Sequence, residues 1–238
     1  MLNFLGIGSA FNTALGNTSA YIKKNSSILL IDCGSTVFSR VLKLDLLKDV
    51  TTSYIVITHT HPDNAGSLGE LIFYCHYILN HKPKIFFPDA SLLSSILNNM
   101  GVNAEFYELI STTSTKIHDE FISDVDLTFV PSSHVSNIPS YSILLKYDKQ
   151  TIFYSGDSKE ISQSTLESLE KGYIDILYQD TCGIDYEGNP HLYIGKLKDY
   201  IKPHLRSKVY CMHIDGSFEK KKAMDLGFNI AKLIEELE

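Results

Sequence analysis

The chain has 238 residues, 44% of them hydrophobic and 21% charged, which is ordinary for a soluble globular protein. The formal net charge is -7, and no basic tail or stripe of lysine and arginine offsets it. A long nucleic acid requires a positive surface that displaces counterions. The charge balance therefore argues against a polyanionic partner and leaves a small phosphorylated molecule open.

The N-terminal sequence, the apolar stretches and the cysteines indicate where the protein is located. The N-terminal sequence MLNFLGIGSAF lacks the basic start and long apolar run of a signal peptide, and no apolar stretch approaches the roughly 20 residues that cross a bilayer. The four cysteines are widely spaced and form no CxxC pair. We therefore expect a cytoplasmic protein without a membrane partner, in which Cys33, Cys75, Cys182 and Cys211 are reduced thiols.

The first part of the chain predicts strands followed by helices. Short apolar runs bounded by turn residues predict four strands, LNFLGIG (2–8), SAYIKK (19–24), SILLIDCG (27–34) and SYIVIT (53–58). Apolar residues then recur at helical spacing and predict an amphipathic helix over 66–80. A second helix is expected over 90–99, closed by Gly101 just past its end.

The second part repeats this arrangement. It predicts three strands and then alternating helices and strands, at 125–131, 141–147, 151–156, 162–171 (helix), 175–179, 191–201 (helix), 208–212 and 221–237 (helix). Two successive blocks of this kind predict two mixed sheets with helices packed outside them, an αββα sandwich of the α/β class. No linker or repeat divides the chain, so we expect a single domain over 1–238.

The segment His59-Thr60-His61-Pro62-Asp63-Asn64 directly follows the predicted strand 53–58. A tight turn at a strand end can direct several side chains toward one point, and imidazoles and carboxylates are the ligands that zinc prefers. A His-x-His pair is also common in polar loops that bind nothing. This segment alone therefore leaves both interpretations open.

Three further potential ligands stand at equivalent places. His134 follows the strand 125–131, Asp157 follows the strand 151–156, and His213 follows the strand 208–212. Each side chain can emerge at the same sheet edge, because each comes immediately after an apolar strand. Coordinated placement of this kind predicts a metal site.

The motifs THTHPDN, the later His134, SGD and MHI resemble the sequential motifs of the metallo-β-lactamase superfamily, and within it the ribonuclease-Z-like branch. The resemblance runs from GIGSAFN near the start to His213. It implies two Zn²⁺ per chain. In that arrangement the first ion is held by His59, His61 and His134, the second by Asp63 and His213, and Asp157 bridges the two.

Position 64 departs from the family pattern HxHxDH, whose last histidine normally ligates the second metal. This chain has Asn64 there. A neutral amide is a poor zinc ligand that acts at best through its carbonyl oxygen, so Asn64 is at most a weak metal ligand. We expect a second site that is weaker, more open, or filled by a harder ion such as Mn²⁺.

Two metals about 3.5–4 Å apart can generate a hydroxide, neutralise a phosphate and stabilise the leaving oxygen. The resemblance implies that Asp63 also orients the attacking water. It further implies a proton donor for the leaving oxygen, His191, in the stretch QDTCGIDYEGNPHLY. Histidine is suited to this role near neutral pH, and the alternative is a surface residue at the start of a helix.

Two substrate classes fit a phosphodiesterase. Transfer-RNA 3′-processing enzymes carry a protruding arm, in many members between the third ligand histidine and the bridging aspartate. Here only 22 residues separate His134 from Asp157, and two predicted strands use them. The phrases GSAFNTALGNTSAY, GSLGELIFY, YQDTCG and LRSKVYCMHID instead resemble the anti-Pycsar phosphodiesterases of phages and their bacterial homologues.

That resemblance implies hydrolysis of 3′,5′-cyclic nucleotides (cCMP, cUMP, cAMP and cGMP) to nucleotide monophosphates, and thereby evasion of Pycsar antiphage defence. It also implies a homodimer that acts in the cytoplasm, which is the host cytoplasm if a phage encodes the chain. Two other activities stay open. If Asn64 disables the second metal site, the protein is a non-hydrolysing cyclic-nucleotide sponge. A lactamase-like or thioesterase-like hydrolase is the other alternative.

Overall fold

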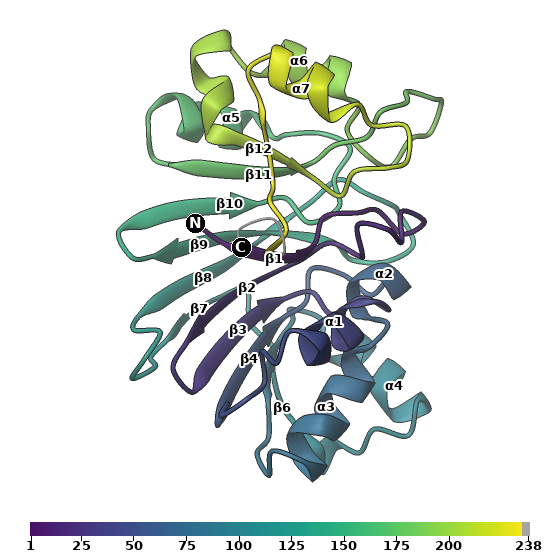
Figure 1. Ribbon diagram of the computed structural model, residues 1–238, viewed down its shortest axis with the longest axis vertical. Coiled ribbons are helices and arrows are strands. Elements are labelled where there is room, and N and C mark those ends of the chain that lie inside the picture. The colour runs from purple at the N-terminus through teal and green to yellow at the C-terminus, as the bar shows by residue number, and fades with distance from the viewer. Residues whose placement is uncertain (235–238) are drawn as a thin grey trace.

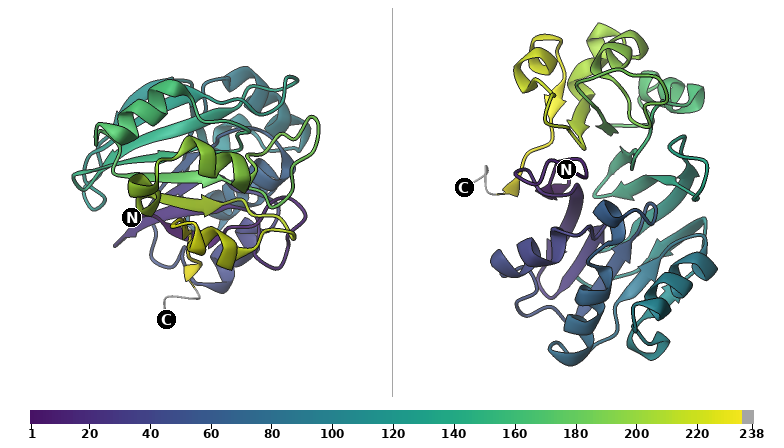
Figure 2. Two further views of the ribbon diagram at one scale, coloured as in Figure 1. Left: turned by 90° about the horizontal axis from the view of Figure 1, so that it is seen from above. Right: turned by 90° about the vertical axis from the view of Figure 1, so that its right-hand side faces the viewer.

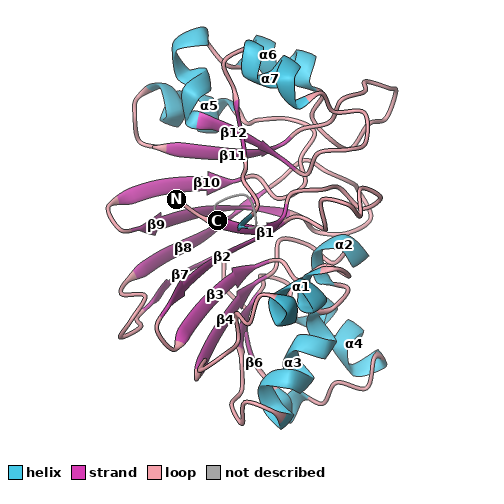
Figure 3. Cartoon of the chain, in the orientation of Figure 1, coloured by secondary structure: helices cyan, strands magenta, loops and turns pink. Residues whose placement is uncertain are grey.

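The computed structural model describes residues 1–234, which form two β-sheets with helices on the outer sides (Figure 1). Helices α1 to α4 lie at one end of the molecule and α5 to α7 at the other, with the strands between them (Figures 2 and 3). The predicted αββα sandwich is confirmed. No helix within residues 1–234 is long and apolar enough to span a membrane.

The first sheet has six strands in chain order and is antiparallel over its first three strands and parallel over the rest. The strands are β1 (Asn3–Gly6), β2 (Ser19–Lys24), β3 (Ser27–Ile31), β4 (Thr52–Val56), β5 (Lys84–Phe86) and β6 (Glu108–Ile110). Its helices are α1 (Val37–Lys43), α2 (Pro62–Ala65), α3 (Leu68–Tyr77) and α4 (Ala90–Asn99), followed by the 3₁₀ turn η1 (Ala104–Phe106).

The second sheet has seven strands in the order β13-β12-β11-β10-β9-β8-β7, antiparallel from β7 to β10 and parallel from β10 to β13. The strands are β7 (Ser114–Ile117), β8 (Val125–Pro131), β9 (Tyr141–Tyr147), β10 (Gln150–Tyr154), β11 (Ile176–Asp180), β12 (Val209–Met212) and β13 (Asn229–Ile230). Its helices are α5 (Gln163–Glu170), α6 (Ile194–Tyr200) and α7 (Lys220–Asp225), with the 3₁₀ helix η2 (Pro203–Lys208).

Strand β3 shows why the apolar runs of this sequence form buried strands. Successive side chains of a strand point to opposite faces of the sheet. Leu29 therefore belongs to the core between the two sheets, in the same cluster as Leu145 and Leu177, whereas Leu30 belongs to the core between the first sheet and its helices. Both faces are buried, so the strand sequence is apolar throughout rather than alternating.

The predicted last helix over 221–237 is wrong. Helix α7 ends at Asp225, and the chain forms β13 at 229–230; residues 235–238 lie outside the described residues. Gly227 has a φ of 93° and stops the helix. Its N–H donates to the Met224 carbonyl and that of Phe228 to the Ala223 carbonyl, the paired bonds of a Schellman ending. Gly101 ends α4 in the same way, as predicted.

Candidate metal centre

The predicted ligands come from four segments that the two sheets bring to one place. His59, His134 and Asp157 each lie three residues after the end of β4, β8 and β10, and His213 directly follows β12. Pro62 begins α2 immediately after His61, which fixes the turn that presents Asp63. The sheet register therefore positions side chains that are up to 154 residues apart in the chain (213 minus 59).

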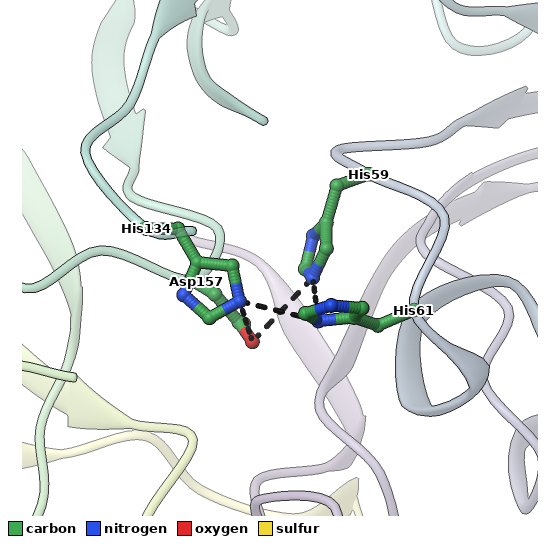
Figure 4. Close-up of side chains that lie close together, drawn as sticks. All are labelled: His59, His61, His134 and Asp157. Atoms are coloured by element: carbon green, nitrogen blue, oxygen red, sulfur yellow. Dashed lines mark hydrogen bonds and ion pairs between the residues drawn. The ribbon is translucent and has the colours of Figure 1, made fainter. Parts of the chain in front are cut away.

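Three imidazoles and one carboxylate form the first ligand group, His59, His61, His134 and Asp157, whose ligand atoms all lie within 4.8 Å of one another. Figure 4 shows their side chains converging. His61 Nδ1 lies 3.0 Å from His59 Nε2 and 3.2 Å from His134 Nε2. Asp157 Oδ2 lies 3.6 Å from His59 Nε2 and 3.8 Å from His134 Nε2.

These spacings fit a divalent metal. Four donors about 2.0–2.1 Å from a tetrahedral zinc lie about 3.4 Å from one another. Burial also lowers the pKa of His59 and His61, and it lowers that of His134 to about 4. The three imidazoles are therefore neutral at neutral pH and have lone pairs available for a metal.

A second ligand group adjoins the first through Asp157. His213 Nε2 lies 3.4 Å from Asp157 Oδ2 and 3.2 Å from Asp63 Oδ2. Burial opposes ionisation of Asp63, but the hydrogen bond and charge of His213 outweigh it and lower the pKa of Asp63 to about 2. Asp63 is therefore an anion that can serve as a ligand or as a hydrogen-bond acceptor for water.

His191 also faces this second group. The ligand atoms of Asp157, His191 and His213 lie within 4.8 Å of one another, and the His191 ring stacks on that of His213 at a centroid distance of 4.8 Å. The helix predicted over 191–201 begins at Ile194, so His191 lies in the preceding loop. Its side chain is 22% exposed and borders the ligand groups instead of standing on an outer surface.

Asp180, which the sequence analysis did not identify, holds both of these rings. It is the last residue of β11 and is fully buried. Its Oδ2 lies 2.7 Å from His191 Nδ1 and its Oδ1 lies 3.4 Å from His213 Nδ1. Burial opposes a charge on His191, but the Asp180 carboxylate outweighs it and raises the pKa of His191 above its ordinary value. Each ring thus keeps its Nε2 for a metal or substrate.

Asn64 occupies the place of the sixth residue of the family motif. It is 1% exposed, and its Nδ2 donates to Asp32 Oδ2 at 3.3 Å. Asp32, also missed in the sequence, accepts further bonds from the Thr58 backbone N–H and hydroxyl at 2.8 Å and 2.9–3.0 Å. The sequence signal for both aspartates is a carboxylate at the end of an apolar run, similar to the signal that identifies the ligands.

A family model described as anti-Pycsar protein Apyc1 matches residues 1–235. The chain belongs to this family. Anti-Pycsar protein Apyc1 of Paenibacillus harenae is 25% identical over 231 residues, covering 92% of this chain and 91% of the relative. Anti-Pycsar protein Apyc1 of Bacillus phage 010DV004 is 27% identical over 237 residues, covering 92% and 90%. Members of the Apyc1 family thus occur in both bacteria and phages.

Among solved structures, the metallo-β-lactamase fold protein YhfI from Bacillus subtilis superposes with a TM-score of 0.76 at 17% identity. The match covers 97% of this chain and 95% of YhfI. This likeness confirms the metallo-β-lactamase fold. The chain thus combines the metallo-β-lactamase fold with two groups of potential metal ligands.

Proposed function

We propose that this protein is a metal-dependent phosphodiesterase that hydrolyses 3′,5′-cyclic nucleotides to linear nucleotide monophosphates and thereby counters Pycsar immunity. The observation that carries the proposal is the pair of ligand groups joined at Asp157, with the ligand atom of His191 within 4.8 Å of those of Asp157 and His213, in a chain of the Apyc1 family. Cyclic pyrimidine nucleotides, cCMP and cUMP, are the first substrates to test, with cAMP and cGMP beside them.

Two divalent metals, Zn²⁺ at least in the first site, would be held by the residues that the resemblance implies. His59, His61 and His134 form the first site and Asp63 and His213 the second, with Asp157 between them. When bound, such ions activate water, neutralise the phosphate and stabilise the leaving oxygen. The matching donor spacings and the neutral imidazoles of the first group support this assignment.

The side chains supply the proton transfers of the reaction. Asp63 accepts a hydrogen bond from the attacking water and directs its oxygen toward phosphorus. The water oxygen bonds to phosphorus as a phosphorus–oxygen bond to the ribose breaks, and the leaving oxygen takes the Nε2 proton of His191. The water releases one proton, which restores the proton on His191 for the next turnover. Asp180 keeps the His191 ring oriented and stabilises its positive charge through the 2.7 Å contact at Nδ1. One water is consumed and one linear monophosphate forms.

A small substrate is favoured over tRNA by the segment between His134 and Asp157. A loop, β9 and β10 account for this segment, and every residue of β10 pairs with β9, from Ile143 opposite Tyr154 to Tyr147 opposite Gln150. A tRNA-clamping arm at this place has no chain from which to form. The net charge of -7 points in the same direction.

The active form is proposed to be a homodimer in the cytoplasm, which is the host cytoplasm for a phage-borne copy. An exposed aromatic cluster on α3 and η1 supports self-association, because soluble monomers rarely leave large apolar patches open. In it Tyr77 is 65% exposed and packs with Phe73 and Phe106, beside Ile78 at 64%. Light scattering coupled to size exclusion gives the mass directly.

The test is nucleotide turnover by protein of known metal content, compared with His61→Ala and with His204→Ala. His204 is an exposed histidine outside both ligand groups, so it controls for the loss of an imidazole as such. Release of linear monophosphates by the parent and His204→Ala, but not by His61→Ala, is the expected result. Tight binding without turnover in all three indicates a sponge, the alternative that Asn64 favours.

A further inference from the structure

The side chain at position 64 has a buried polar atom without a partner. Asn64 is 1% exposed, and among the described residues its Oδ1 receives no hydrogen bond. An amide oxygen left unpaired in a protein interior loses its hydration without gaining a compensating hydrogen bond. Such an atom in a native structure requires a physical explanation, and an ion is one of the explanations that fit.

The orientation of this amide is fixed by its other end. Asn64 Nδ2 donates to Asp32 Oδ2, and Asp32 is itself fully buried and held in place by Thr58. The 3.3 Å contact with Asp32 is made by Nδ2, so the carbonyl oxygen of the amide is turned away from Asp32. Asn64 is also the immediate neighbour of Asp63 in the short helix α2.

We propose that the Asn64 carbonyl oxygen is a ligand of the second metal. The second site then consists of the Asp63 and Asp157 carboxylates, one amide oxygen and the single imidazole of His213. This inference rests on the two-metal centre of the proposed function. It accounts for the unpaired Oδ1. It also explains the contacts of Asp32 with Thr58 and Asn64, which orient the amide so that its oxygen is available to a metal.

The two metal sites then differ in chemistry. The first group offers three imidazoles and one carboxylate. With Asn64 as a ligand, the second site has three oxygens, from Asp63, Asp157 and Asn64, and the single imidazole of His213. Imidazole favours zinc, and carboxylate or carbonyl oxygen favours harder ions such as Mn²⁺. The second site therefore discriminates less between Zn²⁺ and Mn²⁺ than the first, and the natural centre is open to a mixed Zn–Mn occupancy.

His191 is the rival for this ligand position. Its ligand atom lies within 4.8 Å of those of Asp157 and His213, and Asp180 fixes its Nδ1 so that Nε2 is left over. If His191 replaced the missing imidazole of the family motif, the second site would have two imidazoles. The Asn64 carbonyl would then have no role in metal binding, and the two assignments predict opposite outcomes.

The experiment is a titration of metal-free protein with Zn²⁺ and separately with Mn²⁺, followed by calorimetry and elemental analysis. The parent is compared with Asn64→Leu, which keeps the side-chain size without the oxygen, with Asn64→His and with His191→Gln. Asn103→Leu, at an exposed asparagine outside the ligand groups, is the matched control. Retained binding at the first site shows in each variant that the fold is intact.

The parent is expected to bind two ions, the second more weakly. Asn64→Leu loses the second ion or binds it at least about tenfold more weakly, since even outer contacts of metal sites are worth that much, while His191→Gln keeps it. Asn64→His increases the Zn²⁺ over Mn²⁺ preference of the second site. No nucleotide is used, so failure of the proposed activity would not affect this result.

Two results would overturn the proposal. One is a second site whose affinity is the same in Asn64→Leu as in the parent. The other is loss of the second ion in His191→Gln but not in Asn64→Leu, which would assign the ligand position to His191.

Discussion

Replacing Asp180 by asparagine tests how the buried carboxylate connects His191 with His213. The substitution keeps the size of the side chain but removes its charge. The carboxylate serves three groups at once, His191 Nδ1 at 2.7 Å, His213 Nδ1 at 3.4 Å and the Ser158 backbone N–H at 2.9 Å. Oδ2 accepts the hydrogen bonds of both His191 and Ser158, and Oδ1 makes only the ion-pair contact with His213. An asparagine that keeps its oxygen at the Oδ2 position therefore places its NH₂ group against His213 Nδ1 and removes that contact.

The magnitude follows from the contacts that are lost. Removing the partner that orients a metal-ligating histidine costs about 10–100-fold in metal affinity, or about 1.4–2.7 kcal/mol. We expect a loss of this size at the second metal site through His213, and none at the first site. Burial lowers the pKa of His191, and the Asp180 charge is the largest contribution that raises it. Without that charge the pKa of His191 falls.

The assay is the pH profile of cyclic-nucleotide turnover at saturating metal, together with metal affinity. A proton donor acts below its pKa, so a lower pKa moves the alkaline limb of the profile to lower pH in Asp180→Asn. Asp175→Asn is the matched control, because Asp175 accepts a backbone bond from Thr151 on the adjacent strand and is exposed. An unchanged alkaline limb and unchanged second-site affinity in Asp180→Asn would refute this account of the carboxylate.

Three further predictions concern the scaffold. A Cβ at Gly34 would lie 1.9 Å from the Asp63 carbonyl oxygen. Gly34→Ala is therefore expected to displace Asp63 and to weaken metal binding at the second site in the calorimetric titration. An affinity equal to that of the parent would contradict this. Removal of the metal by a chelator should lower the melting temperature. An ion at 100 times its Kd stabilises the native state by about 2.7 kcal/mol, which corresponds to roughly 5–10 °C in melting temperature for a chain of this size. Identical melting curves with and without chelator would argue against a preformed site. Leu145→Ala, at a fully buried position between the sheets, should lower the free energy of unfolding by about 2–5 kcal/mol in urea titrations, whereas a change below about 1 kcal/mol would refute its place in the core.

The long apolar strands could be predicted from the sequence, and the short elements could not. Strands β8 and β9 stand at the predicted bounds because each has seven residues with a clear pattern. Strands β5 and β6 have only three residues each and owe their conformation to pairing with neighbours that are distant in sequence. Helix α1 has two buried residues, Val37 and Val41, too few to give a periodic signal.

The site divides in the same way. The predicted ligands follow apolar strands that can be recognised in the sequence. The two sheets bring these ligands together, as the resemblance to the superfamily motifs implies. Asp180 and Asp32 also follow apolar runs, but their roles depend on partners 11 and 26 residues away, His191 and Thr58, which no local pattern reveals. The orientation of the Asn64 amide is likewise a product of tertiary structure.

The measurement that tests the central claim most directly is turnover of cCMP, cUMP, cAMP and cGMP, with and without added Zn²⁺ or Mn²⁺. We predict metal-dependent release of the linear monophosphates, abolished in His61→Ala. Absence of turnover for all four nucleotides, in protein that elemental analysis shows to hold both metals, would contradict the phosphodiesterase account.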